Sequence, residues 1–246
     1  MKLSLFISIV SITLLQSKGL VLECFFDNEL LFDDLKVAYT CTVLKLYTNV
    51  TLRNVSSVAG KHIEKNTNED ITQLYIINQK MEYFPIGFTK FFHNLVAIHA
   101  GRNNLKYLER NDLKEFAKIR YLYLYTNQLE VLQSDVFQFN QALEYVSFYN
   151  NRLTHIGSKI LLPLVRLKTA YFNKNICIDK QAVMSEQGIS ELKLEIAERC
   201  SDITDEDLMN MMKLNSMKVN KLENKVAQIS EQLNTIIGLL KNKNGQ

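Results

Sequence analysis

One motif recurs through the middle of the chain at a fixed spacing of 24 residues. The pattern is L-x-x-L-x-L-x-x-N-x-L, with other apolar residues in place of some leucines, and its copies begin at Ile71, Leu95, Ile119, Leu143 and Leu167. A fixed period of this length is the signature of a solenoid, in which each unit stacks only on its neighbours. A single unit cannot bury its own apolar side chains, so the units must fold together.

The period and the pattern are those of leucine-rich repeats, whose units run about 20–29 residues. The segment YLYLY, Tyr121 to Tyr125, alternates large side chains between two faces, which predicts a short strand in each unit. Stacked units place these strands side by side in a parallel sheet. We therefore expect an α/β solenoid, a short leucine-rich-repeat arc of five 24-residue repeats over residues 71–176.

An asparagine recurs where each unit turns away from the predicted sheet. The four positions are Asn103, Asn127, Asn151 and Asn175. An amide both donates and accepts hydrogen bonds, so we expect these side chains to bond the backbone of neighbouring coils rather than a ligand. Gln79 takes this place in the first unit, where we expect a less regular turn.

The N-terminal segment carries the features of a secretory signal. Lys2 precedes an apolar run over residues 3–15, and the small residues Ser17 and Gly19 follow it. The run is too short for a membrane span, and no later run reaches about 18 apolar residues. We expect a signal peptide over residues 1–19 and a secreted, extracellular protein without membrane insertion. The alternative is that this segment forms a buried strand or helix.

The four cysteines form an even set, which in a secreted chain predicts disulfides. Three connectivities are possible; the positions favour Cys24 with Cys41 and Cys177 with Cys200, because each pair brackets one end of the repeats. Both ends of a solenoid need caps. We therefore expect an N-terminal cap over residues 20–70 and a C-terminal cap over residues 177–200, with a helix over residues 182–200.

Two short sequons, at Asn49 and Asn54, are glycan acceptors in a secreted glycoprotein. Such sequons also occur by chance. If they are used, this segment lies at the protein surface.

Aligning the repeats places seven of the eleven tyrosines on the solvent-facing, concave side of the strands. The predicted ligand-binding residues are Tyr75, His99, Tyr121, Tyr123, Tyr125, Tyr145, Tyr149 and Tyr171. Tyrosine suits half-exposed strands, and neighbouring rings pack on each other, so a structural explanation exists. The functional explanation is a protein-binding surface, because tyrosine offers a large contact area at little entropic cost. We favour the second.

Other function classes find little support in the sequence. The net charge is +3 and no element carries a Lys/Arg cluster, which argues against nucleic-acid binding. The chain contains no C-x-x-C, H-E-x-x-H, G-x-S-x-G or phosphate-binding loop. We therefore expect a protein that is not an enzyme, with no catalytic residues, no metal site and no cofactor.

After Cys200 the apolar period changes to a heptad. The seam comprises Leu208, Met212, Asn215, Val219, Leu222, Val226, Ile229, Leu233, Ile236 and Leu240. This pattern predicts a coiled-coil tail over residues 201–246 that joins identical or different chains. The seam residues do not fix the number of strands. The alternative is a helix that folds back on its own solenoid.

The combination of signal peptide, capped leucine-rich repeats, paired cap cysteines and a terminal coiled coil resembles the secreted leucine-rich-repeat proteins of insects. In plan it is similar to the leucine-rich immune proteins of mosquitoes, and the resemblance covers nearly the whole chain. It implies a circulating protein that pairs through cysteines and coiled coils and holds complement-like factors. This chain differs in its short array and in lacking an odd cysteine for an intermolecular bridge.

The sequence thus predicts a secreted protein-binding module, oligomerised by its tail, with an extracellular protein as ligand and an innate-immune adaptor or recognition role. The alternative function is an extracellular matrix or structural protein whose repeats bind fibres or glycans.

Overall fold

The computed structural model describes residues 19–30, 37–47, 53–201, 226 and 228–230. The chain divides into two compact units, Met1–Asp202 and Ile203–Gln246. In the second unit the described residues are helical, and Val226 and Ile229 are exposed. The other predicted seam residues that carry the oligomerisation hypothesis lie outside the described residues: Val219, Leu222, Leu233, Ile236 and Leu240. So do residues 1–18 of the predicted signal and the sequon at Asn49.

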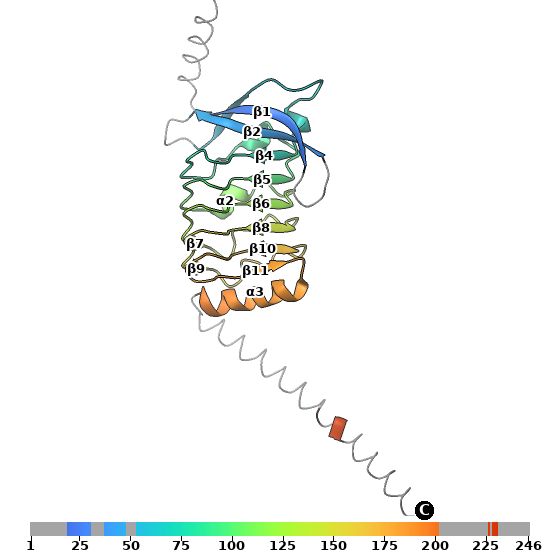
Figure 1. Cartoon of the computed structure of the whole chain (residues 1–246), viewed down its shortest axis with the longest axis vertical. Coiled ribbons are helices and arrows are strands. Elements are labelled where there is room, and N and C mark those ends of the chain that lie inside the picture. Colours follow the sequence, from blue (N-terminus) through green and yellow to red (C-terminus); the bar gives the residue numbers. More distant parts are fainter. Residues whose placement is uncertain (1–18, 31–36, 48–52, 202–225, 227, 231–246) are drawn as a thin grey trace, which may run out of the picture. The chain divides into compact units, whose positions relative to one another are not determined.

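A nine-stranded, mostly parallel sheet forms the first unit, with the strand order β11-β10-β8-β6-β5-β4-β2-β1-β3 (Figure 1). Its strands are β1 (Leu20–Leu30), β2 (Val37–Tyr47), β3 (Val55–Ala59), β4 (Gln73–Tyr75), β5 (Ala97–His99), β6 (Tyr121–Tyr123), β8 (Tyr145–Ser147), β10 (Thr169–Tyr171) and β11 (Gln181–Val183). A second, two-stranded sheet pairs β7 (Val131–Leu132) with β9 (His155–Ile156). Helices are few: α2 (Arg110–Leu113), α3 (Glu186–Arg199) and the 3-10 turns η1 (Asn68–Asp70) and η2 (Phe88–Lys90).

Five of these strands, β4, β5, β6, β8 and β10, pair in parallel and in register with the sequence motif. The central residue of each aligns with that of the next strand, in the order Leu74, Ile98, Leu122, Val146 and Ala170. A slip of one residue would turn every apolar side chain to the wrong face. The repeated pattern therefore fixes the pairing of the strands.

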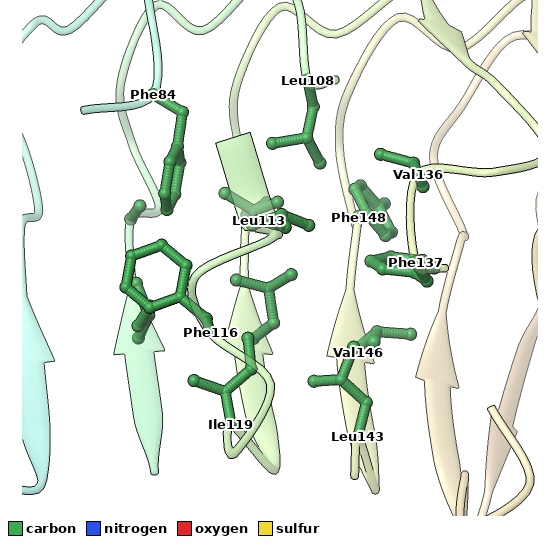
Figure 2. Packing of buried hydrophobic residues seen from close by; sticks show 14 of the residues in the cluster. Phe84, Leu108, Leu113, Phe116, Ile119, Val136, Phe137, Leu143, Val146 and Phe148 are labelled. Carbon is green, nitrogen blue, oxygen red and sulfur yellow. The ribbon is translucent and has the colours of Figure 1, made fainter. Parts of the chain in front are cut away.

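The main core lies between the sheet and the segments that return the chain to the next strand. Figure 2 shows side chains of three successive repeats side by side: Leu113 and Phe116 of the second, Ile119, Val136 and Phe137 of the third, and Leu143, Val146 and Phe148 of the fourth. Each of these side chains is nearly or fully buried. Burying one large apolar side chain contributes about 1.5–3 kcal/mol, so the stacked coils share one continuous source of stability.

The recurring asparagines bond the backbone of adjacent coils, as predicted. Asn127 Nδ2 donates to the carbonyl oxygens of Ala100 and Leu124, each at 3.0 Å, and its Oδ1 accepts from Leu105 N at 3.1 Å. Asn103, Asn151 and Asn175 make the equivalent bonds to their own and the preceding coil. These amides satisfy interior carbonyls where the strand has ended, so the row stabilises the turn of every coil.

The first turn is less regular, as expected from Gln79. Its amide donates to Val43 O at 3.0 Å and accepts from Leu46 N at 3.2 Å, which ties the repeat to β2. In all five coils the residue before the amide side chain has a positive φ; the values are 59° at Asn78, 54° at Arg102, 54° at Thr126, 55° at Asn150 and 57° at Lys174. In the first coil alone, Lys80 adds a second positive φ, of 58°.

The N-terminal segment extends the sheet. Strand β2 pairs in parallel with β4, while β1 pairs antiparallel with β2 and parallel with β3. A disulfide joins Cys24 of β1 to Cys41 of β2, in agreement with the favoured pairing. The predicted cap is thus a set of strands that continues the faces of the repeat sheet.

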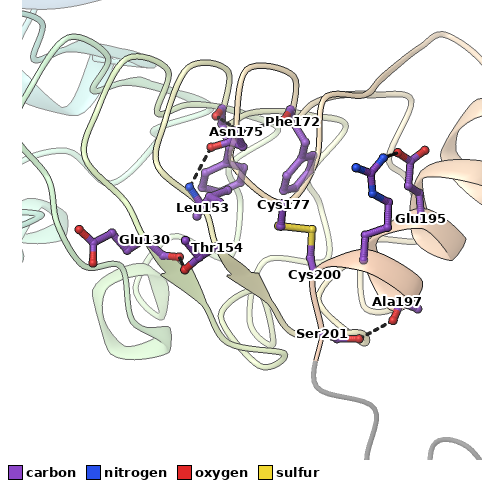
Figure 3. The surroundings of a disulfide bond; sticks show 12 residues. Glu130, Leu153, Thr154, Phe172, Asn175, Cys177, Glu195, Ala197, Cys200 and Ser201 are labelled. Atoms are coloured by element: carbon purple, nitrogen blue, oxygen red, sulfur yellow. Dashed lines mark hydrogen bonds and ion pairs between the residues drawn. A yellow bond between two sulfur atoms is a disulfide. The ribbon is translucent and has the colours of Figure 1, made fainter.

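At the other end, β11 pairs antiparallel with β10 and α3 packs against β11. Ile189, Leu192 and Ile196 of α3 are buried. Figure 3 shows the disulfide between Cys177 and Cys200 that anchors the helix end to the last coil, again in the favoured pairing.

The expected helix start at residue 182 is wrong. Ala182 lies in β11, paired with Ala170, and the helix begins at Glu186 after the N-cap Ser185, whose hydroxyl accepts from Gly188 N at 2.9 Å. Strand pairing thus outweighs helical periodicity for the first residues of the segment. No helix within the described ranges has the length and apolarity needed to cross a membrane.

Candidate functional site

The sheet has two faces with separate clusters of buried side chains. The main core covers one face, and a second cluster on the opposite face contains Ala38, Ala97, Tyr121 and Tyr123, with Tyr125 and Tyr145 packed against it. We call this opposite face the aromatic face; it carries the third, fifth and seventh motif positions. All eight predicted ligand-binding residues lie on it.

A continuous row of aromatic rings in contact crosses the aromatic face from β4 to β10. The distances between ring centroids are 4.2 Å for Tyr75–His99, 3.9 Å for His99–Tyr123, 4.5 Å for Tyr123–Tyr145 and 5.6 Å for Tyr145–Tyr171. The row changes motif position in the fourth coil, where the small Ser147 occupies the fifth position and Tyr145 from the third position continues the contact. Contacts of this kind are typical of favourable aromatic pairs.

The eight residues are not equally accessible. His99, Tyr121 and Tyr123 are only 3%, 2% and 4% exposed, whereas the remaining five tyrosines are half-buried. The expectation that all eight face solvent is therefore wrong for these three. The rings of His99 and Tyr123 each have a ring on both sides, and Tyr121 lies in the same cluster with Ala38 of β2. The three buried residues form the centre of the face. The side chains that a partner can reach are Tyr75, Tyr125, Tyr145, Tyr149 and Tyr171.

Burial lowers the pKa of His99 to about 3, so its imidazole is neutral at physiological pH. Its ring stacks on Tyr123 with an interplanar angle of 10° and meets Tyr75 at an edge. His99 thus serves as an uncharged ring of the row, in the place that a tyrosine takes in the next coil.

The seventh motif position places two rings at the rim of the face. Tyr125 lies against the backbone of Gly101, because a Cβ at that glycine would stand 2.6 Å from the Tyr125 ring. The ammonium of Lys174 lies 5.2 Å from the centre of the Tyr149 ring, and a hydrogen bond to Tyr149 raises the pKa of Lys174. Both tyrosines are thus held in place by neighbours while part of each ring faces solvent.

The N-terminal end of the aromatic face is acidic. Asp27 and Glu29 of β1 pair with Thr40 and Ala38 of β2, and Thr40 pairs in turn with Gln73 of β4. Burial, and then the charge of Asp27, raise the pKa of Glu29. Burial also raises the pKa of Tyr75 to about 12, with the charge of Glu29 as the next cause. Glu29 therefore lies within electrostatic reach both of Asp27 and of Tyr75.

A row of ion pairs lies directly before the N-terminal ends of strands β6, β8 and β10. Glu144 accepts from Arg120 Nε and from Lys168 Nζ, each at 2.6 Å, and these hydrogen bonds and charges lower its pKa to about 2. The guanidinium of Arg120 also lies 5.2 Å from the centre of the Tyr121 ring. This row links three successive coils and holds one edge of the face in place.

Sequence reasoning missed Asp27, Glu29, Gly101 and the contact of Lys174 with Tyr149. The two carboxylates lie in β1, outside the repeat, so aligning the motif copies did not place them on the face. The alternation Phe25, Asp27, Glu29 within the predicted N-terminal cap was the available signal. Among the described residues, no group of three or more His, Cys, Asp or Glu side chains is arranged to hold a metal ion.

The second sequon lies within the described residues. Asn54 is exposed, and its backbone forms a parallel bridge with Ile86 beside the edge strand β3. Its carbonyl oxygen accepts from Leu20 N at 2.8 Å. The side chain is therefore at the surface, which a glycan acceptor requires.

Comparison with protein-family models and with curated proteins finds no match. Among solved structures, the chain is similar to one titled as the complex of Toll with Spatzle, a molecular hub in Drosophila development and innate immunity. The sequence identity is 19% and the TM-score is 0.41. The match covers 59% of this chain and 19% of that chain, so the matched part spans about a fifth of the other chain's length.

Proposed function

We propose that this chain is a secreted, non-enzymatic binding module built from five leucine-rich repeats, and that it binds an extracellular protein through its aromatic face. The observation that carries the proposal is that some rings of the face are buried and others are partly exposed. Three buried residues, His99, Tyr121 and Tyr123, lie at the centre of the face, and the partly exposed Tyr75, Tyr125 and Tyr145 pack against this centre. Such a surface loses little conformational freedom on binding, which raises affinity for a given contact area.

Several features support an extracellular setting. The described residues contain two disulfides and no free cysteine, and disulfides persist in oxidising compartments. The predicted signal peptide and the exposed sequon at Asn54 agree with secretion. The similarity in plan to insect leucine-rich-repeat proteins, including the mosquito immune proteins, is the basis for an innate-immune adaptor or recognition role.

The heptad seam after Cys200 supports assembly through the tail. Linking several aromatic faces would increase apparent affinity without new contacts at each face. Sedimentation of the secreted, deglycosylated protein under non-reducing conditions tests this step. We expect a discrete dimer or higher oligomer, and a monomer at all concentrations would contradict it.

Binding is tested with the full-length protein immobilised and exposed to extracellular fluid from its source organism. We expect the double variant Tyr125→Ser with Tyr149→Ser to lose the proteins that the wild type retains. Gly101→Ala should weaken retention as well, because the added Cβ displaces the Tyr125 ring. The matched control is Tyr107→Ser, whose ring is 60% exposed but lies outside the aromatic face.

Identical retention by all four proteins would contradict the proposal. Retention on extracellular-matrix extract instead of by a fluid-phase protein would favour the structural role. Circular dichroism and a thermal melt of each variant exclude loss of folding as the cause of lost binding.

A further inference from the structure

The row of rings on the aromatic face ends at β4, although the sheet continues beyond it through β2 and β1 (Figure 1). In the register, Tyr75 of β4 pairs with Thr42 of β2, and Thr42 pairs with Phe25 of β1. Directly opposed residues of paired strands lie on the same face of a sheet, and the next residue, Phe26, is buried in the main core on the other face. Phe25 therefore lies in line with the row but is separated from it by Thr42.

Strand β2 supplies no ring to the aromatic face. Its residues on that face are Ala38, Thr40 and Thr42. A similar interruption in β8, at the small Ser147, is filled by Tyr145, two residues earlier on the same strand. In β2 the residue two positions earlier is Thr40, which has no ring. The row is therefore interrupted over Thr42, which is half-buried and so within reach of a partner.

The exposure of the rings follows from this interruption. His99 and Tyr123 each have a ring on both sides and are only 3% and 4% exposed. Phe25 has no ring contact with any described residue and is 53% exposed. Tyr75 contacts the ring of His99 on one side and is half-buried. The two rings that flank Thr42 thus leave apolar surface in water, which a partner can cover with a gain in free energy.

The interruption has the width of one ring. Neighbouring strands lie about 4.8 Å apart, so two strand spacings, roughly 10 Å, separate Phe25 from Tyr75 at the backbone. Within the row, ring centroids on neighbouring strands are 4.2 Å apart for Tyr75–His99 and 3.9 Å apart for His99–Tyr123. One ring over Thr42 can therefore contact both flanking rings. An aromatic side chain gains more there than an aliphatic one, because aromatic pairs are stabilised beyond the area that they bury.

We propose that the partner protein inserts an aromatic side chain over Thr42, between Phe25 and Tyr75, and thereby completes the row of rings. This inference rests on the proposed protein-binding function and adds the chemistry of the partner's anchor residue. Aromatic residues are enriched among the few side chains that contribute most of the binding energy of an interface. The partly exposed tyrosines between Tyr75 and β10 then contact the rest of the partner, so the anchor determines where the partner lies along the sheet.

A pentapeptide with one aromatic side chain, acetyl-Gly-Gly-Trp-Gly-Gly-amide, tests the inference on the full-length protein. The chain contains no tryptophan, so tryptophan emission reports the peptide alone. We expect saturable binding to the wild type, with a shift of the emission to shorter wavelength. Phe25→Ser removes one of the two flanking rings and should weaken binding by about fivefold or more. The ring is exposed, so this variant should fold like the wild type.

Thr42→Tyr places a ring of the chain's own in the interruption. We expect this variant to melt at or above the wild-type temperature, because tyrosine suits a half-buried strand position and would contact a ring on each side. It should bind the peptide more weakly by about tenfold or more, because the place is already occupied. The matched control, Val131→Tyr, adds the same ring at an exposed position of β7, outside the aromatic face, and should bind within about twofold of the wild type.

The inference is overturned if the wild type does not shift the emission of the peptide. It is also overturned if Phe25→Ser or a folded Thr42→Tyr variant binds the peptide as tightly as the wild type. Retention of native proteins from extracellular fluid distinguishes this failure from failure of the proposed function. If the Thr42→Tyr variant retains the native partner while the Tyr125/Tyr149 variant loses it, the face binds a partner without this anchor. If both variants retain it, both proposals fail.

Discussion

Two rows of side chains cross the same coils, and they follow different rules. The asparagine row repeats one residue type at Asn103, Asn127, Asn151 and Asn175, and every amide bonds backbone atoms of its own and an adjacent coil. The aromatic row instead changes from tyrosine to histidine and changes motif position at Ser147. A site that must satisfy fixed backbone atoms admits few residues, whereas a site that only needs a flat ring admits several.

The difference shows where such a chain is free to acquire specificity. The asparagine row fixes the turn of each coil and leaves no atom for a partner. The aromatic row fixes only its buried centre, and its rim carries Tyr125 and Tyr149, the acids of β1 and Lys174. Substitutions should therefore affect stability strongly in the first row and unevenly in the second.

The largest effect is expected for Asn127→Ala. The variant leaves Ala100 O, Leu124 O and Leu105 N without this amide in a buried turn, which should lower the free energy of unfolding by about 3 kcal/mol. Urea denaturation measures the loss. Asn175→Ala, at the half-buried end of the row, is the comparison and should lose less. Equal losses at both positions would show that burial does not set the strength of the row.

A smaller loss of stability is expected within the aromatic row, and its size should differ sharply between a buried and a half-buried ring. Tyr123→Ser removes a ring that is 4% exposed and contacts a ring on both sides, so the free energy of unfolding should fall by about 2–3 kcal/mol. Tyr149→Ser removes a half-buried ring and should cost below about 1 kcal/mol. Thermal melts of the two variants side by side measure the difference. Similar melting temperatures would mean that the row has no buried centre.

Glu144→Gln should cost about 1 kcal/mol at neutral pH, because Arg120 and Lys168 remain partly open to screening solvent. The folded pKa of Glu144 is about 2, below its ordinary value of 4.5. Its stabilising effect is therefore present above pH 4.5 and is lost as the pH falls toward 2. Denaturation of both proteins across this range should show their curves converging. A constant difference down to pH 2 would contradict the ion-pair account.

The smallest expected effect is a gain in stability, at Thr126. Thr126 has a φ of 54°, a conformation that is strained for a β-branched residue, while asparagine occupies the same motif position at Asn78 and Asn150. Thr126→Asn should raise the free energy of unfolding by about 0.5 kcal/mol. The loss of the exposed hydrogen bond from Asn150 Nδ2 to Thr126 Oγ1 offsets part of this gain. Denaturant midpoints at matched slope measure it. A clear loss would show that this hydrogen bond outweighs the backbone strain.

Much of the fold follows from the sequence, because the motif repeats without a gap. The strand register and the asparagine turns were predictable from the spacing of the motif, and the favoured one of three possible cysteine pairings is confirmed. The aromatic face was located, but its accessibility was not, since alternation tells which side a ring takes and not how closely its neighbours cover it. Tyr121 and Tyr123 illustrate this limit.

The remaining misses arise where the repeat ends. Asp27 and Glu29 reach the face through the pairing of β1 with β2, which lies outside the repeat and therefore outside the alignment of the motif copies. Ala182 joins a strand because Ala170 offers it an edge, although its own segment reads as helix. Local pattern therefore predicts the units well and the ends poorly.

The parallel pairing of β2, β4, β5, β6, β8 and β10 has a consequence for the reach of the molecule. Neighbouring strands lie about 4.8 Å apart, so the separation between the acids of β1 and Lys174 is set by the number of coils between them. Adding or removing one 24-residue unit would change that separation by a single strand spacing and leave both ends intact. The number of coils therefore determines how long a partner segment must be to reach from the acids of β1 to Lys174.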